Sequence, residues 1–257
     1  MILSHSKKFI FFKTLKTSST SLEIILSKYL NELDVITPID QPDEHIRISK
    51  GFKTKQNYKY SSLELIKKFK LKSLHVLYYK LLSSYFSSKF YDNYLPPKFL
   101  KFSQHQTAES IKANVSREIW NNYYKFTILR NPIDQIVSNF FYVKNNSKQF
   151  KIFIGLSFED YLSRYAKNFF QRNVNIFSIN GKIIVDFIIK YEDLERGLDH
   201  LINKLNLDKN IYDDYKSTKT KSNNYNESQK KKILTDENLE LIKMNIPEIY
   251  KKIYKYD

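Results

Sequence analysis

The sequence predicts an α/β fold with a central, mainly parallel sheet, because short apolar strands alternate with amphipathic helices along the chain. Two strand–loop–helix units, at residues 8–30 and 125–141, share the same layout. A third observation is the Asn180-Gly181 pair between two apolar runs, which is typical of a tight β-hairpin. The chain of 257 residues has the length of a single domain, taken here as residues 1–257.

The first unit begins with an expected buried strand at residues 9–12. A polar loop follows, and the next helix carries Leu22, Ile25 and Leu26 on one face. Free N–H groups at a helix start, together with the helix dipole, favour a bound anion. The side chains that add positive charge or hydrogen-bond donors are Lys16, Thr17, Ser18, Ser19, Thr20 and Ser21. In the alternative interpretation these hydroxyls are ordinary helix caps.

The same loop contains no glycine, whereas an ATPase-type P-loop needs two. This disfavours a kinase or nucleotide hydrolase. Residues 31–104 differ from the rest of the chain because they are rich in Lys, Ser and Tyr and lack strong strands. One or two helices are expected between residues 61 and 90. We interpret residues 31–104 as a helical insertion that either shapes a substrate cleft or simply covers the sheet.

The second unit pairs an expected strand at residues 125–129 with a helix that starts at Pro132. Arg130 follows the strand directly, at the sheet edge where ligands of open α/β sheets bind. Ser138 lies two turns into the helix. Arg130 and Ser138 together could bind a second phosphate, whereas the alternative for Arg130 is an ion pair with Asp134.

Three elements are expected in the remainder of the chain. A hairpin joins strands at residues 175–179 and 182–189, and a helix follows at residues 194–205. Residues 216–232 are polar. A final helix is expected at residues 235–254, with a kink at Pro247.

Composition narrows the class of protein further. The chain has no cysteine, which excludes disulfides, cysteine-bound zinc and thiol catalysis. No apolar run reaches the roughly 18 residues of a membrane helix, and no signal peptide precedes the first strand, so a cytoplasmic location is expected. The net charge of +16 comes mostly from lysine, in a composition typical of AT-rich coding. No specific nucleic-acid partner is therefore expected, although a positive field would attract anionic ligands.

Residues 11–22 resemble the 5′-phosphosulfate loop of sulfotransferases, and residues 126–141 resemble their 3′-phosphate motif. The similarity is greatest to the carbohydrate-type (Golgi-related, family 2-like) enzymes and their bacterial relatives. Residues 105–111 look like the histidine segment of that family, and residues 183–194 look like its strand and turn after the hairpin. The resemblance covers residues 7–30 and about 103–207. It is weak in the final helix and does not extend to residues 31–102.

This resemblance implies a P-loop-like three-layer sandwich that binds 3′-phosphoadenosine 5′-phosphosulfate (PAPS) and needs no metal. The implied activity is transfer of the sulfuryl group to a hydroxyl or amine of a carbohydrate-like acceptor. The loop residues Lys16, Thr17, Ser18, Ser19, Thr20 and Ser21 would hold the 5′-phosphosulfate, and Arg130 and Ser138 the 3′-phosphate. Lys16 would also stabilise the leaving oxygen, because sulfuryl transfer depends on positioning and charge stabilisation as phosphoryl transfer does.

The acceptor needs a base, and histidine is the natural type. His105 matches the family's histidine segment and is the expected base or substrate contact. The other candidates are His5, His45, His75, His200, Glu44 and Glu109. Many relatives have Pro and Gly where this chain has Leu15 and Ser19. This departure and the net charge suggest one alternative, a weak or inactive nucleotide- or nucleic-acid-binding protein on the same fold. A second alternative is a kinase-like phosphotransferase.

Overall fold

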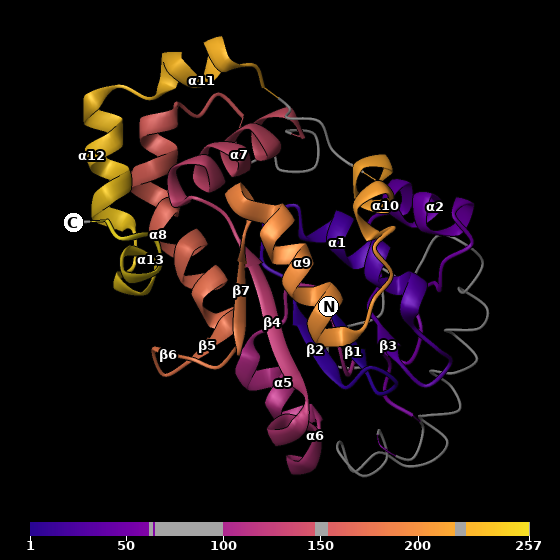
Figure 1. Ribbon diagram of the computed structural model, residues 1–257. Helices are drawn as coiled ribbons and strands as arrows, with labels where there is room; N and C mark the ends of the chain where they lie inside the picture. Colours follow the sequence, from indigo (N-terminus) through magenta and orange to yellow (C-terminus); the bar gives the residue numbers. More distant parts are fainter. Residues whose placement is uncertain (62–63, 65–99, 147–153, 219–224, 257) are drawn as a thin grey trace, which may run out of the picture.

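A computed structural model describes residues 1–61, 64, 100–146, 154–218 and 225–256. Its centre is a five-stranded mixed sheet in the order β3-β1-β2-β4-β7 (Figure 1). The strands are β1 (Ile2–Ser4), β2 (Phe9–Phe12), β3 (Val35–Ile36), β4 (Tyr124–Leu129) and β7 (Phe187–Lys190). β2, β4 and β7 run parallel, whereas β1 is antiparallel to both β2 and β3. The predicted α/β class is confirmed, but the sheet is mixed instead of mainly parallel, because β1 runs antiparallel to both of its neighbours.

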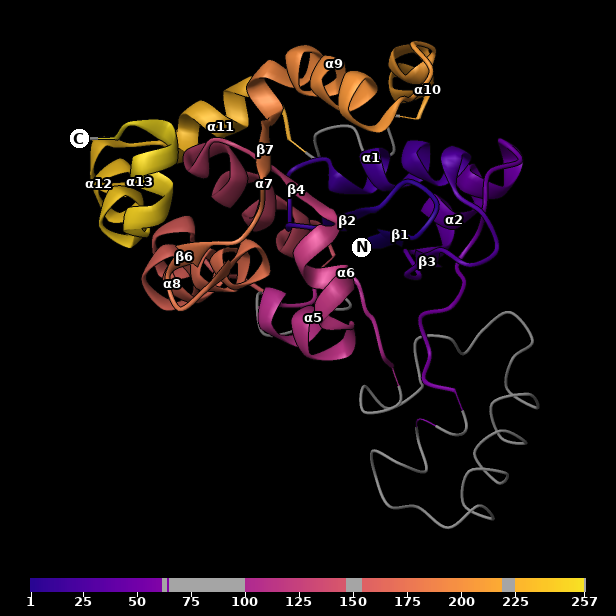
Figure 2. The same ribbon diagram turned by 60° about the horizontal axis from the view of Figure 1, so that its bottom comes forward.

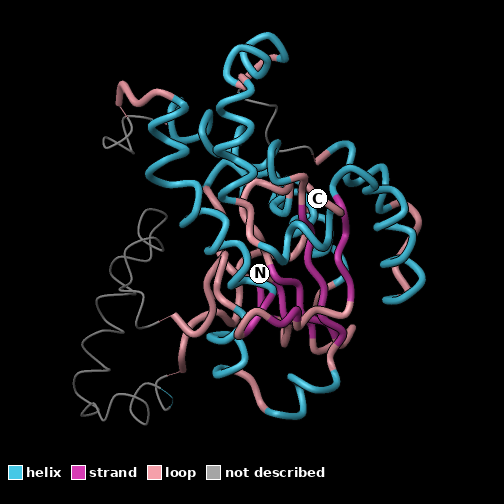
Figure 3. The backbone as a smooth tube through the Cα atoms, turned by 90° about the vertical axis from the view of Figure 1, so that its left-hand side faces the viewer, coloured by secondary structure: helices cyan, strands magenta, loops and turns pink. Residues whose placement is uncertain are grey.

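Helices cover both faces of this sheet because its strands are buried on both sides. Phe9 and Phe11 pack in one core cluster with Leu22 and Leu201, whereas the alternating residues Ile10 and Phe12 pack in another cluster with α5. In Figure 2, α1, α9 and α10 lie on one side of the sheet and α5, α6 and α8 on the other. Figure 3 shows the strands together in the interior, with helices on either side.

The helices of the first half follow the strands closely. They are α1 (Ser19–Leu26) with the 3₁₀ turn η1 (Ser27–Tyr29), α2 (Gln41–Ser49), α5 (Ala108–Asn114), α6 (Arg117–Asn122) and α7 (Pro132–Asn145). The predicted helices after residues 18 and 131 are confirmed as α1 and α7. Within the predicted insertion, β3 forms an edge of the sheet and α2 packs beside α1; neither was predicted. The helices expected between residues 61 and 90 lie outside the described residues.

The second half contains α8 (Phe158–Phe177), β5 (Ser178–Ile179), β6 (Lys182–Ile183), η4 (Tyr191–Asp193), α9 (Leu194–Leu205), α10 (Ile211–Ser217), α11 (Glu227–Ile233), α12 (Asp236–Asn245) and α13 (Glu248–Tyr254). The hairpin at Asn180-Gly181 is confirmed, and both residues have positive φ as a tight turn requires. No described helix is long and apolar enough to cross a membrane.

Three predicted boundaries in this half are wrong. Residues 175–177 are the last turn of α8 instead of a strand, because their apolar side chains continue the buried face of that helix. The strand expected at residues 182–189 is two strands in different sheets: the chain leaves β6 and returns at Asp186, whose N–H bonds Lys125 O at 2.7 Å. The final helix breaks into α12 and α13 because Ile246, before Pro247, is extended.

Candidate functional site

Two loops meet at the carboxyl edge of the central strands. β2 and β4 are adjacent and parallel, with Phe12 opposite Thr127. The loop after β2, residues 13–18, therefore lies beside the segment after β4, which contains Arg130. This is the edge at which open α/β sheets bind ligands. The structure thus brings together the two segments that the sequence predicts as phosphate sites.

The loop of residues 13–18 turns sharply without glycine. Lys16 (φ 61°) and Ser18 (φ 62°) both adopt left-handed backbone conformations. Hydroxyl groups stabilise the turn from within: Thr14 and Thr17 share a hydrogen bond at 2.9 Å, and Ser19 Oγ donates to Thr14 O at 2.6 Å. The hydroxyls of Thr17 and Ser19 therefore hold the loop itself.

The start of α1 carries no side-chain cap. Ser18 occupies the N-cap position, but its side chain accepts no hydrogen bond from the following amides. Its Oγ instead pairs with the hydroxyl of Tyr215 at 2.8 Å. The amides of the first turn, which includes Ser19, Thr20 and Ser21, therefore begin a helix whose positive dipole end lacks an acidic residue.

Lys16 reaches across to α7. Its Nζ lies 3.9 Å from the centre of the Tyr142 ring, a cation–π contact. Tyr142 and Ser138 are four residues apart on α7 and so share one face of that helix. Lys16 and Ser138, predicted for different phosphates, thus lie along the same side of the site.

Arg130 is surrounded by aromatic rings. Its guanidinium carbon lies 4.8 Å from the centre of the Tyr191 ring, and its buried Nε has no hydrogen-bond partner among the described residues. The alternative pairing with Asp134 is not formed, because Asp134 bonds Lys230 at 2.6 Å. A buried donor without a partner is costly, so Arg130 is suited to an anion that the described residues do not supply.

Tyr215 connects the loop with Arg130. Burial raises the pKa of Tyr215 to about 12, so its hydroxyl is protonated at neutral pH and can donate to Ser18. The positive charge of Arg130 acts on the same hydroxyl and opposes that rise. Burial likewise raises the pKa of Tyr225, again opposed by Arg130. Ser18 and Arg130 therefore belong to one site, which has an aromatic wall formed by Tyr191 and Tyr215.

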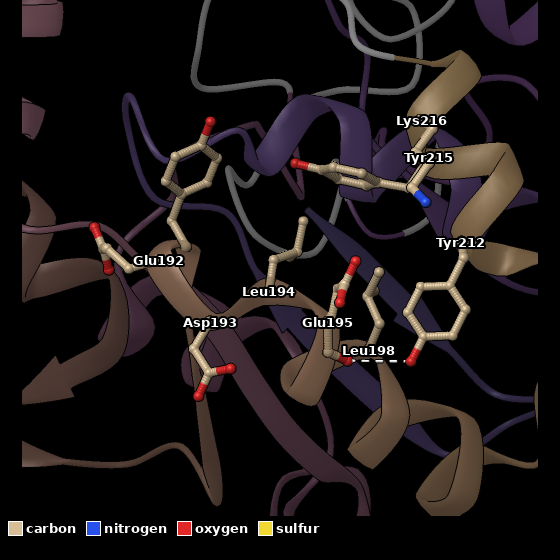
Figure 4. Close-up of a pocket in the computed structure, with 9 residues that line it drawn as sticks. Glu192, Asp193, Leu194, Glu195, Leu198, Tyr212, Tyr215 and Lys216 are labelled. Atoms are coloured by element: carbon tan, nitrogen blue, oxygen red, sulfur yellow. Dashed lines mark hydrogen bonds between the residues drawn. The ribbon is translucent and has the colours of Figure 1, made fainter.

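A cavity of about 370 Å³ opens between α9 and α10, beside Tyr191 (Figure 4). Tyr212 and Tyr215 enter it from α10, and Leu194 and Leu198 from α9. The cavity thus joins the aromatic wall of Arg130. Its mixture of rings, aliphatic side chains and carboxylates suits an uncharged ring system with polar edges.

His105 lies against the other side of the loop. Its Nδ1 is 2.9 Å from Lys13 O, and since a carbonyl only accepts, Nδ1 carries the proton and Nε2 has a free lone pair. Burial, together with the charge of Lys13, lowers the pKa of His105 to about 3. His105 has a positive φ of 56°, a strained conformation that is common at functional sites.

The other candidate bases lie elsewhere. His5 pairs with Tyr123, and His200 bonds Tyr124 and stacks on Phe187. His45 is exposed on α2, and His75 lies outside the described residues. Glu44 bonds Arg47 at 2.9 Å and Glu109 is exposed on α5.

Sequence reasoning missed four residues of the site. Tyr191 and Tyr215 form the aromatic wall, and the buried amides of Gln135 and Asn173 hold the peptide groups of Leu15. Gln135 follows Arg130 by five residues, but glutamine in a helix carries no signal of its own. Among the described residues no cluster of His, Cys, Asp or Glu is arranged to hold a metal ion.

Comparison with known proteins gives little information about function. No family model matches the chain, and no solved structure matches it. A protein of Archaeoglobus fulgidus described as uncharacterised is 33% identical over 101 residues, which cover 38% of this chain and 79% of that protein. The chain therefore belongs to the same family as this archaeal protein, whose description assigns no activity.

Proposed function

We propose that the protein binds PAPS and transfers its sulfuryl group to a hydroxyl or amine of a carbohydrate-like acceptor. The observation that carries the proposal is the buried, unpartnered Nε of Arg130 beside the loop of residues 13–18. Two anion-type sites at one sheet edge suit a nucleotide that carries phosphates at two separate places. The helices on both faces of the sheet support the finer assignment, a P-loop-like three-layer sandwich.

Each group has a role in this proposal. Lys16 and the amides from Thr17 to Ser21, at the end of the loop and the start of α1, hold the 5′-phosphosulfate. Arg130 and Ser138 hold the 3′-phosphate, and the ring of Tyr191 packs against the guanidinium of Arg130. The purine base occupies the cavity between α9 and α10, where aromatic rings stack favourably on bases.

The chemistry is an in-line displacement at sulfur. The bond from sulfur to the phosphate oxygen breaks while a bond to the acceptor oxygen forms, and Lys16 stabilises the negative charge on the departing oxygen. The acceptor proton goes to Nε2 of His105, which is the free ring nitrogen. Bound anions raise the pKa of a nearby histidine, which makes His105 a stronger base in the complex than alone.

Residues 31–104 are proposed to shape the acceptor cleft. The end of this segment reaches the site, since Gln104 Oε1 accepts from Lys13 Nζ at 3.3 Å and His105 follows directly. An acceptor bound against this segment would therefore meet His105 and the loop together.

Calorimetric titration with 3′-phosphoadenosine 5′-phosphate, the donor product, tests the proposal. Lys16→Ala and Arg130→Ala should each weaken binding at least about tenfold, because each removes a charge-assisted contact. The matched controls Lys243→Ala on α12 and Arg164→Ala on α8 remove the same charges at exposed positions and should bind normally. Absence of binding, together with salt-sensitive binding to any duplex DNA, would support the nucleic-acid alternative. Turnover of ATP with magnesium would support the phosphotransferase.

A further inference from the structure

The loop of residues 13–18 holds a conformation that its residues disfavour. Lys16 and Ser18 are left-handed, and each such residue other than glycine is strained unless its surroundings impose the conformation. Glycine would adopt this turn without strain, but the loop has none. The hydroxyl bonds within the loop stabilise it, and contacts from outside the loop add to them.

Two buried amide side chains make these contacts, both at Leu15. The N–H of Leu15 donates to Asn173 Oδ1 at 2.8 Å, and Gln135 Nε2 donates to Leu15 O at 2.6 Å. Asn173 and Gln135 are both fully buried. The two bonds fix the peptide groups on either side of Leu15, and hence the direction in which the chain enters Lys16.

Neither amide can reverse its donor and acceptor ends. Asn173 Nδ2 donates to Phe169 O at 3.1 Å within α8, which leaves Oδ1 facing the loop. The hydroxyl of Tyr250 on α13 donates to Gln135 Oε1 at 3.1 Å, which leaves Nε2 facing Leu15. Tyr250 is fully buried and burial raises its pKa, so it stays a donor. Side chains from three helices, α7, α8 and α13, thus contribute to the loop conformation.

We propose that Asn173 and Gln135 are positioning residues that hold the loop in its anion-binding conformation, in place of glycine. Neither side chain contacts the sulfuryl donor PAPS; both act through the backbone of Leu15. This inference rests on the proposed function, because the conformation they hold is the one that presents Lys16 and the first amides of α1.

The first test is hydrogen exchange of the Leu15 amide in the free protein. Asn173→Ala should speed this exchange at least about tenfold, because a buried hydrogen bond is lost. Asn175→Ala, an exposed position on the same helix, is the matched control and should leave it unchanged. Tyr250→Phe removes only the hydroxyl that orients Gln135 and gives a milder second variant should Asn173→Ala fail to fold. Leu15 exchange that stays at the wild-type rate in both variants would overturn the inference.

The second test is affinity for 3′-phosphoadenosine 5′-phosphate. Asn173→Ala should weaken it about tenfold with little loss in Asn175→Ala. In the Asn173→Ala background, Ser18→Gly should bind at least about fivefold better than Ser18→Ala. Only glycine keeps the left-handed turn once the hydrogen bond between Leu15 and Asn173 is lost. Equal affinities of the two Ser18 variants would contradict the role in place of glycine. If the wild-type protein does not bind the nucleotide, the proposed function fails. The exchange experiment still tests whether Asn173 and Gln135 hold the loop conformation.

Discussion

Replacement of Glu23 by glutamine should be among the most destabilising single changes in the described chain. Glu23 lies on α1 and is fully buried. One carboxylate oxygen lies 2.6 Å from Lys13 Nζ, and the other lies 3.2 Å from Thr37 Oγ1 and 3.7 Å from Arg47 Nη2. Burial alone would raise the pKa of Glu23, but the neighbouring cations, led by Lys13, lower it to about 2. The carboxylate is therefore charged at neutral pH and compensates buried positive charge.

Glu23→Gln keeps the size of the side chain and removes that compensation. Lys13 and Arg47 are almost entirely buried and would lose the carboxylate that pairs with them. Breaking a buried ion pair on one side typically costs about 3–5 kcal/mol in free energy of unfolding. At this chain length, each kcal/mol lowers the melting temperature by about 2–4 °C, so a fall of about 10 °C is expected.

The assay is urea denaturation of the wild type, Glu23→Gln and two further variants. Glu32→Gln removes a carboxylate bonded to Lys53 on the surface and should leave the midpoint unchanged, because exposed pairs contribute little. Adding Lys13→Met to Glu23→Gln should restore part of the loss, since Arg47 keeps its bond to Glu44. A loss below about 1 kcal/mol for Glu23→Gln, or a further loss on adding Lys13→Met, would refute the reasoning.

Three further predictions concern the site and the sheet. Tyr215→Phe loses the bond to Ser18 and should weaken nucleotide affinity about fivefold by calorimetry; unchanged affinity would contradict this. Gly197→Ala would place a methyl 2.5 Å from Ile189 Cγ2 and should cost about 1–3 kcal/mol in urea denaturation, so a raised midpoint would be inconsistent. The pKa of His105 is about 3 when folded and near 6.5 when unfolded, so acid favours unfolding. From pH 6.5 to 5.5 the wild type should lose about 1 kcal/mol more than His105→Gln; equal losses would contradict a neutral His105.

Local patterns in the sequence were sufficient for the elements that frame the site. Residues 9–12 are a continuous apolar run and residues 125–129 are apolar at three of five positions, as is typical of parallel strands buried on both faces, and both strands are confirmed. The wrong boundaries have local causes too. Ile176 and Phe177 are apolar like residues of a strand, and only the periodicity that starts at Phe158 assigns them to α8. Asp186 divides the next strand by a contact with Lys125, which lies in a distant part of the chain.

The remainder of the candidate site depends on contacts that no local pattern encodes. Arg130 stands directly after β4 and Lys16 stands in the loop after β2, and both are places where ligand residues are expected from a sequence. Gln135, Asn173 and Tyr215 are ordinary helical residues by sequence. They matter because α7, α8 and α10 pack around the loop, and that packing follows from the order of the strands and the faces of the helices.

The two hydrogen bonds that hold Leu15 have a consequence for synthesis on the ribosome. Gln135 lies 120 residues after Leu15, and Tyr250 follows Gln135 by another 115. The loop is therefore translated early, yet it acquires its final shape only after α13 has left the exit tunnel. Until β4 emerges, the nascent chain exposes the apolar strand β2 without its parallel partner, a state prone to aggregation. Emergence of α13, rather than translation of the loop, would then mark the time at which the loop first takes its final shape.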